Sequence, residues 1–154
     1  MYLNAKRYLS DYNEADLAKK KEMLNLFPEL DSYLVDYSMQ ETGHPIKEIT
    51  ANIGYWRKAN AIHGWFVQEV QDGEDDCKEY YVDKEKLQEL KTLCEQVLAD
   101  RSRAEELLPS TSGFFFGSTE YDDWYFSDLE STIEIINKAL LLPKDWDFHY
   151  RSSW

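Results

Sequence analysis

The sequence of 154 residues contains few cysteines, prolines and glycines: two, four and six, respectively. Cys77 and Cys94 belong to no CxxC motif and have no histidine at the spacing of a metal site, so we expect two free thiols and a reducing compartment. No apolar run approaches the ~20 residues that a membrane-spanning helix needs, and the N-terminal residues include no apolar stretch of a signal peptide. These absences predict a cytoplasmic protein without a membrane partner.

Positive charge is also scarce. The chain has 17 Lys and Arg residues against 30 Asp and Glu residues, which gives a formal net charge of -13 and a pI near 4.6. Because general binding to a phosphate backbone requires a basic surface, this balance argues against duplex nucleic acid as a partner. Hydrophobic residues make up 43% of the chain and aromatic residues 15%, which is enough for a folded core.

The charge is distributed unevenly along the chain. Residues 51–71 carry two cations and one acid, a balance of +1. Residues 72–100 carry four cations and ten acids, a balance of -6, and residues 109–130 carry five acids and no cation. The segment 51–71 is therefore the place where an anionic group would be repelled least.

No repeat, low-complexity tract or linker divides the chain, so we expect a single domain at 1–154. Its expected parts are a helical N-terminal part at 1–50, a motif-bearing core at 53–140 and an aromatic C-terminal arm at 143–154. Apolar periodicity and capping residues predict helices at 14–27 after Asn13, at 30–38, at 53–70, from Asp83 onward, after Ser102, and from Thr119 or Ser127 to 140. Short extended pieces are expected at 79–82, at 114–116 and in the arm. We therefore predict a mostly α, compact helical fold with minor β.

The first candidate site segment is the predicted helix that contains the two cations of 51–71. At ~100° per residue, Trp56, Asn60 and His63 lie on one flank of its apolar stripe. There Trp56 offers a stacking surface, and Asn60 and His63 offer donors and acceptors to a pocket. The long side chains of Arg57 and Lys58 could reach an anion at the rim. The alternative is that Asn60 and His63 are hydrogen-bonded internally or solvated.

Two further features lie in or after this segment. Gly64 within a helix costs ~1 kcal/mol relative to Ala, which suggests the close approach of another element or a ligand. The acidic stretch 72–76 does not have the spacing of an EF-hand loop and is best explained as a solvated loop, with one carboxylate turned inward to orient Arg57 or His63. Cys77 has no adjacent base, so we assign no catalytic residue, and we expect no metal site and no cofactor.

The second candidate site segment is the loop 110–122, which has three consecutive phenylalanines between glycines. Phe115 is a candidate for the residue that points away from the local core. Ser118 and Thr119 precede a predicted helix N-terminus, where free N–H groups and hydroxyls can hold a phosphate or carboxylate, although the order of a P-loop is absent. Tyr121 and Asp122, together with Trp124 and Tyr125, could form a second wall of the same cavity. Simple loop packing and a helix start explain the segment equally well.

Together, the motifs around Tyr55-Trp56-Arg57-Lys58, Gly73-Glu74-Asp75-Asp76-Cys77 and Gly113–Asp122 resemble a family of small proteins encoded in bacteriophages, prophages and some bacteria. The resemblance covers residues 53–140. It implies a phage setting, and hence the cytoplasm of the host cell, but no particular chemistry.

Our leading hypothesis is a small accessory protein that binds a small anionic, nucleotide-like ligand. A base would stack on aromatic faces, while Arg57 or Lys58 meets the phosphate. In the phage setting that the resemblance implies, such a protein could sequester a host nucleotide signal used in defence.

Two hypotheses from other classes stay open. The first is an acidic interaction protein that imitates nucleic acid and occupies a basic host protein. The second is a phosphodiester or nucleotide hydrolase that uses His63 with Asp75, Asp76 or Asp122. A homodimer is also expected, because five Trp, eleven Tyr and seven Phe exceed what one small core hides and aromatic residues are enriched at interfaces.

Overall fold

The computed structural model describes residues 1–33, 35–38, 41–43, 45–113 and 118–153, and it describes side chains outside 31–44. Phe115 and the expected extended piece at 114–116 lie outside these residues. The chain divides into two compact units: the larger unit contains residues 1–5 and 51–154, and the smaller unit contains residues 6–50. The expectation of a single domain stays a prediction.

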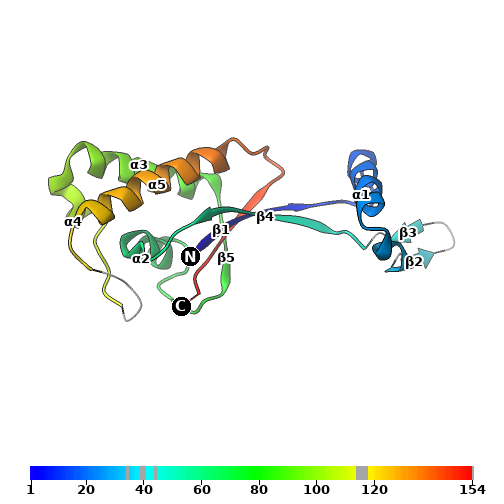
Figure 1. Cartoon of the computed structure of the whole chain (residues 1–154), viewed down its shortest axis with the longest axis horizontal. Helices are drawn as coiled ribbons and strands as arrows, with labels where there is room; N and C mark the ends of the chain where they lie inside the picture. Colours follow the sequence, from blue (N-terminus) through cyan, green and yellow to red (C-terminus); the bar gives the residue numbers. More distant parts are fainter. Residues whose placement is uncertain (34, 39–40, 44, 114–117, 154) are drawn as a thin grey trace. The chain divides into compact units, whose positions relative to one another are not determined.

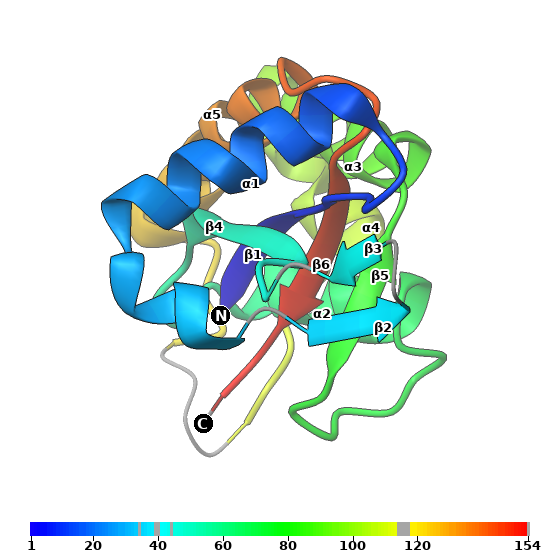
Figure 2. The same ribbon diagram turned by 90° about the vertical axis from the view of Figure 1, so that its right-hand side faces the viewer.

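The fold is α/β, so the prediction of a mostly α fold with minor β is wrong. Four strands form one antiparallel sheet in the order β4-β1-β6-β5: β1 (Tyr2–Tyr8), β4 (Glu48–Tyr55), β5 (Glu79–Val82) and β6 (Asp147–Arg151). Figure 2 shows these four strands side by side. In the pairing of β5 with β6, Tyr80 lies opposite Tyr150.

Strand β4 overturns the expected helix at 53–70. Its last residues, Ile53, Gly54 and Tyr55, are extended, and the helix begins only at Asn60. Gly54 is required because a Cβ there would lie 2.4 Å from the side chain of Ile135 on the helix that packs over the strand. The apolar residues of 53–70 belong partly to a strand and partly to a helix. Both elements contribute to the same core, and their combined spacing resembled one helical face.

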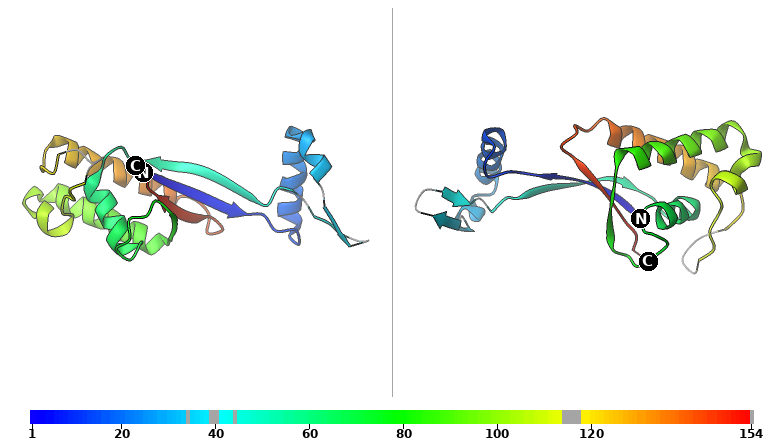
Figure 3. Two further views of the ribbon diagram at one scale, coloured as in Figure 1. Left: turned by 90° about the horizontal axis from the view of Figure 1, so that it is seen from below. Right: turned by 180° about the vertical axis from the view of Figure 1, so that it is seen from behind.

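The larger unit holds the hydrophobic core of the described residues. Its helices are α2 (Asn60–Glu69), α3 (Lys84–Ala99), α4 (Ala104–Leu107) after the 3-10 turn η2 (Arg101–Arg103), and α5 (Asp123–Leu140). Figures 1 and 3 show α3 and α5 lying side by side. Helix α2 packs on the sheet through the stacked rings of Phe66 and Tyr150, whose centroids are 3.9 Å apart.

The smaller unit contains α1 (Glu14–Leu26), the 3-10 helix η1 (Pro28–Tyr33) and the hairpin of β2 (Val35–Ser38) with β3 (Glu41–Gly43). The fully buried ammonium of Lys20 bonds the carboxylate of Asp11 at 2.5 Å, and Lys47 donates to the same carboxylate. These two lysines lower the pKa of Asp11 to about 2. The N-terminal part at 1–50, which was expected to be helical, thus also contains strands: β1, β2, β3 and the first residues of β4 lie there.

Several sequence predictions are confirmed where capping or alternation was clear. Asn13 caps α1 and Asp83 caps α3 through side-chain bonds to Asp16 N and Lys86 N. Tyr150 and its neighbour Phe148 are buried in β6, as the alternation of the C-terminal arm predicts.

Other boundaries differ from the prediction. The stretch expected to be helical at 30–38 ends at Tyr33 and continues as β2. The long helix begins at Asp123, not near Thr119 or Ser127, because Asp122 accepts bonds from Trp124 N and Tyr125 N. Among the residues described, no helix is long and apolar enough to cross a membrane.

Candidate functional site

A cavity of about 310 Å³ lies in the larger unit, beside the beginning of α2 and the beginning of α5. Figure 1 shows the segment that leads into α5 coming down next to α2. The cavity is lined by Arg57, Lys58, Ala59, Asn60, Ala61, Ile62, Ser118, Glu120, Asp122, Trp124, Tyr125, Asp128 and Leu129. It therefore joins the two candidate segments that the sequence indicated separately.

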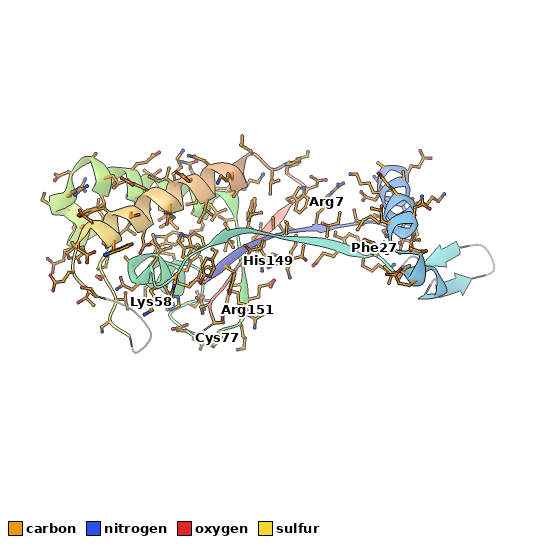
Figure 4. All side chains as sticks on the ribbon, viewed as in Figure 1. Arg7, Phe27, Lys58, Cys77, His149 and Arg151 are labelled. Carbon is orange, nitrogen blue, oxygen red and sulfur yellow. The ribbon has the colours of Figure 1, made fainter. Side chains whose placement is uncertain are left out.

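The turn between β4 and α2 forms one wall. Lys58 in this turn has a φ of 63°, in the left-handed region that favours glycine. This conformation costs a non-glycine residue roughly 1–2 kcal/mol. Backbone strain of this kind is concentrated at binding and catalytic sites. Figure 4 labels Lys58 close to the start of α2.

Helix α2 begins without a side-chain cap. Its N-cap residue is Ala59, and the first turn contains no acidic residue, whereas α1, α3 and α5 each begin with an Asn or Asp side-chain cap. The first backbone N–H groups of a helix have no partner within the helix and carry partial positive charge. Because this first turn lines the cavity, those groups favour an anion there.

Arg57 and Lys58 add two full positive charges to the same wall. Both residues are exposed, and neither forms an ion pair with a residue in the described part of the chain. In a protein with a net charge of -13, two adjacent cations without a carboxylate partner can meet an anion from solution.

Asn60 holds the two walls together. Its Nδ2 donates to the carbonyl of Ser118 at 2.9 Å, and its Oδ1 accepts from the hydroxyl of Ser110 at 3.0 Å. Both polar atoms of the Asn60 amide are thus used to fix the loop that leads to α5. One turn later, Gly64 allows the same loop to approach the helix closely, because a Cβ there would lie 2.3 Å from Thr111 Oγ1. The close approach that Gly64 suggested is confirmed, and the approaching element is this loop.

The segment before α5 and the first turns of α5 contribute three carboxylates to the lining. Asp122 Oδ1 caps α5, and Glu120 is exposed. Asp128 is half-buried, and among the residues described its carboxylate has no hydrogen-bond or ion-pair partner. Burial, and secondarily the charge of Asp122, raises the pKa of Asp128 to about 6. This side of the cavity is therefore suited to hydrogen-bond donors.

Two aromatic residues complete the site. Trp124 is 80% exposed at the rim, where its ring is available for stacking. Tyr125 is buried and its hydroxyl donates to the carbonyl of Leu108 at 2.8 Å, which fixes its ring in the wall. Burial raises the pKa of Tyr125, so the phenol stays protonated.

His63 does not line the cavity. It is 2% exposed, its Nδ1 lies 2.7 Å from the hydroxyl of Tyr150, and its Nε2 lies 3.0 Å from Oδ2 of Asp75. Since a carboxylate only accepts and burial raises the pKa of Tyr150, the arrangement assigns Tyr150 as donor to Nδ1 and Nε2–H as donor to Asp75. The inward-turned carboxylate of the acidic loop is therefore confirmed, and its partner is His63. With both ring nitrogens bonded internally, His63 supplies no base to the cavity.

The remaining predicted residues are placed as follows. Trp56 is 2% exposed in the core, and its indole N–H donates to Thr132 Oγ1 at 2.9 Å. Thr119 and Tyr121 are exposed beside the cavity without lining it, and Tyr121 packs edge-on against Tyr125. The structure thus brings together Arg57, Lys58, Asn60, Ser118 and Asp122.

Sequence reasoning did not find Asp128, although Trp124 and Tyr125 were expected in a second wall. Asp128 precedes Leu129 on the buried face of α5, and a carboxylate at the edge of an apolar stripe was the available signal. In the described part of the chain, no group of three His, Cys, Asp or Glu side chains is placed to hold a metal ion. No protein family, curated protein or solved structure matches the chain.

Proposed function

We propose that this chain binds a small, nucleotide-like ligand in the cavity beside α2, with the anionic group of the ligand at Arg57 and Lys58. The observation that supports the proposal most strongly is that two cations without an ion-pair partner among the described residues share one cavity with an uncapped helix N-terminus. Each of these features attracts an anion, and together they converge on one place.

A simple inorganic anion would contact the cations but would leave the carboxylates and Trp124 of the cavity without a partner in the ligand. The lining also includes the three carboxylates of Glu120, Asp122 and Asp128, which repel a second anionic group and accept hydrogen bonds from donors. Trp124 at the rim offers a face for a flat ring. A ligand with an anionic end and a donor-bearing ring end matches both walls, and a nucleotide has these two ends.

The size of the cavity supports a single nucleotide. Ligand pockets range from roughly 300 to 1,000 Å³. With about 310 Å³, this cavity lies at the lower end of that range, which favours a mononucleotide over a larger ligand.

Calorimetric titration with nucleoside monophosphates tests the proposal. Wild-type protein should bind at least one of them, and thermal stability should rise with ligand by about 2.7 kcal/mol at a hundredfold excess over Kd. Replacing both cations (Arg57→Gln with Lys58→Gln) should weaken binding at least tenfold. Lys138→Gln, on the exposed surface of α5 and outside the cavity, is the matched control and should bind as the wild type does.

Absence of binding by every nucleotide, or equal affinity in the double variant, would remove the proposal. Recovery of product in place of intact ligand would favour the hydrolase alternative. Capture of a basic protein that is released as salt rises would favour the acidic interaction protein.

The biological setting is proposed on the resemblance to phage-encoded proteins alone. In the cytoplasm of a host cell, a protein that holds a nucleotide without consuming it would sequester a signal used in defence. Such a role requires binding tight enough to compete with the host receptor, which the same titration measures.

A further inference from the structure

One of the three carboxylates that line the cavity is half-buried and forms no hydrogen bond or ion pair with the described residues. Asp122 uses its Oδ1 to cap α5, and Glu120 is exposed to water. Asp128 is half-buried, lines the cavity and has no hydrogen-bond partner for its carboxylate among the residues described. The half-buried carboxylate is partly desolvated, so a donor from a ligand gains more there than at a fully solvated carboxylate.

The groups around Asp128 narrow the choice of donor. Asp122 and Glu120 line the same cavity, and Tyr125 donates its hydroxyl to the carbonyl of Leu108. Neither Arg57 nor Lys58 forms an ion pair with Asp128. The carboxylate therefore offers two acceptor oxygens, to which no residue in the described chain donates. Two parallel donors on a flat ring satisfy such a carboxylate in a bidentate manner.

Nucleobases differ in this respect. Guanine presents N1–H and the N2 amino group side by side. Adenine and cytosine each present one amino donor next to a ring nitrogen acceptor, which a carboxylate repels. Uracil presents one N–H between two carbonyl acceptors. Only guanine offers the pair of adjacent donors.

We propose that Asp128 selects guanine, so that the ligand of this site is a guanine mononucleotide whose phosphate meets Arg57 and Lys58. This inference rests on the proposed function of the cavity and adds the identity of the base. The other bases should bind more weakly, because they leave the Asp128 carboxylate or their own polar groups without a partner. Such an unpaired group lowers affinity more than a missing apolar contact does.

The test is a calorimetric comparison of the monophosphates of guanosine, adenosine, inosine and xanthosine. Guanosine monophosphate should bind wild-type protein at least tenfold more tightly than adenosine monophosphate. Inosine monophosphate, which lacks the N2 amino group, should fall between them. The exposed Glu134→Gln on the same helix is the matched control and should leave this order unchanged.

Asp128→Asn supplies a readout that a merely structural role would not produce. The Asn amide accepts from N1–H and donates to a carbonyl at position 2, so the variant should lose its preference for guanosine and prefer xanthosine monophosphate. Equal binding of all four ligands, with loss of binding when both cations are replaced, would overturn the assignment of guanine but not the proposed function. An unchanged guanine preference in Asp128→Asn would also overturn it. If none of the four binds, the assignment of guanine is overturned, and the proposed function is overturned as well if the pyrimidine monophosphates do not bind either.

Discussion

At the scale of single residues, the cavity contains two features that a protein selected for stability alone would lack. Lys58 adopts a left-handed backbone conformation, and Asp128 is a half-buried carboxylate with a raised pKa. Both lie in the wall of the same cavity. Strain and unpaired burial at one site are typical of binding sites, where they are offset by the rest of the fold.

Replacing Asp128 with Asn should therefore stabilise the protein at neutral pH. The pKa of about 6 in the folded protein lies above the ordinary value of 3.8 for an Asp side chain, so the folded state binds more protons than the unfolded state between these values. Wild-type stability consequently falls as pH rises from about 4 to 7, and the Asn variant avoids this loss. After allowance for partial exposure, we expect a gain of about 1 kcal/mol at pH 7.5 and a smaller gain at pH 5, measured by urea unfolding.

Glu134→Gln on the same helix should show no such difference between the two pH values. A stability difference for Asp128→Asn that is the same at pH 5 and pH 7.5, or a loss of stability in the variant, would contradict a raised pKa of Asp128 in the folded protein.

At the scale of elements, local signals predicted the helices better than the sheet. The capping residues Asn13 and Asp83 predict the starts of α1 and α3 from the sequence. A cap bonds residues that follow it directly, so the signal is local. Strands β1 and β4 depend on pairing between residues about 50 positions apart, as in the mutual bonds of Met1 and Trp56. No local pattern carries that pairing, which explains why the last residues of β4, Ile53 to Tyr55, were predicted as part of a helix.

The candidate site divides in the same way. Arg57 and Lys58 stand out in the sequence because they form the positive segment of an acidic chain. Asp128 could not be identified in this way, since its role depends on how α5 packs against the beginning of α2. His63 had the right residue type and spacing, but Tyr150 and Asp75 engage both of its nitrogens.

The contact of α2 with the loop before α5 can be tested at Gly64. A Cβ at this position would lie 2.3 Å from Thr111 Oγ1, so Gly64→Val should displace the loop and destabilise the protein by about 1–3 kcal/mol. Affinity for the ligand should fall as well, because the same loop carries Ser118 in the cavity wall. Thermal unfolding and calorimetry measure the two effects.

Thr111→Gly provides the compensating change. Alone it should have little effect, and combined with Gly64→Val it should restore most of the stability and the affinity, a coupling that a double-mutant cycle quantifies. Additive effects of the two substitutions would show that the loop does not depend on this contact.

At the scale of the whole molecule, the candidate site lies within one of the two compact units. All residues that line the cavity belong to the larger unit, as does the hydrophobic core of the described residues. The smaller unit is held by its own buried contacts, including Lys20 with Asp11. The net charge of -13 disfavours general binding of phosphates, so an anion must be recognised by local geometry.

The most direct test of the central claim is a titration of isotope-labelled protein with guanosine monophosphate, followed by amide chemical shifts in NMR spectra. The cavity beside α2 predicts that the largest, saturable shifts fall on residues 57–62 and 118–129. Amides of α1, which has no residue in the cavity, should serve as the internal reference and shift little. The absence of saturable shifts, or shifts concentrated away from those two segments, would contradict the account.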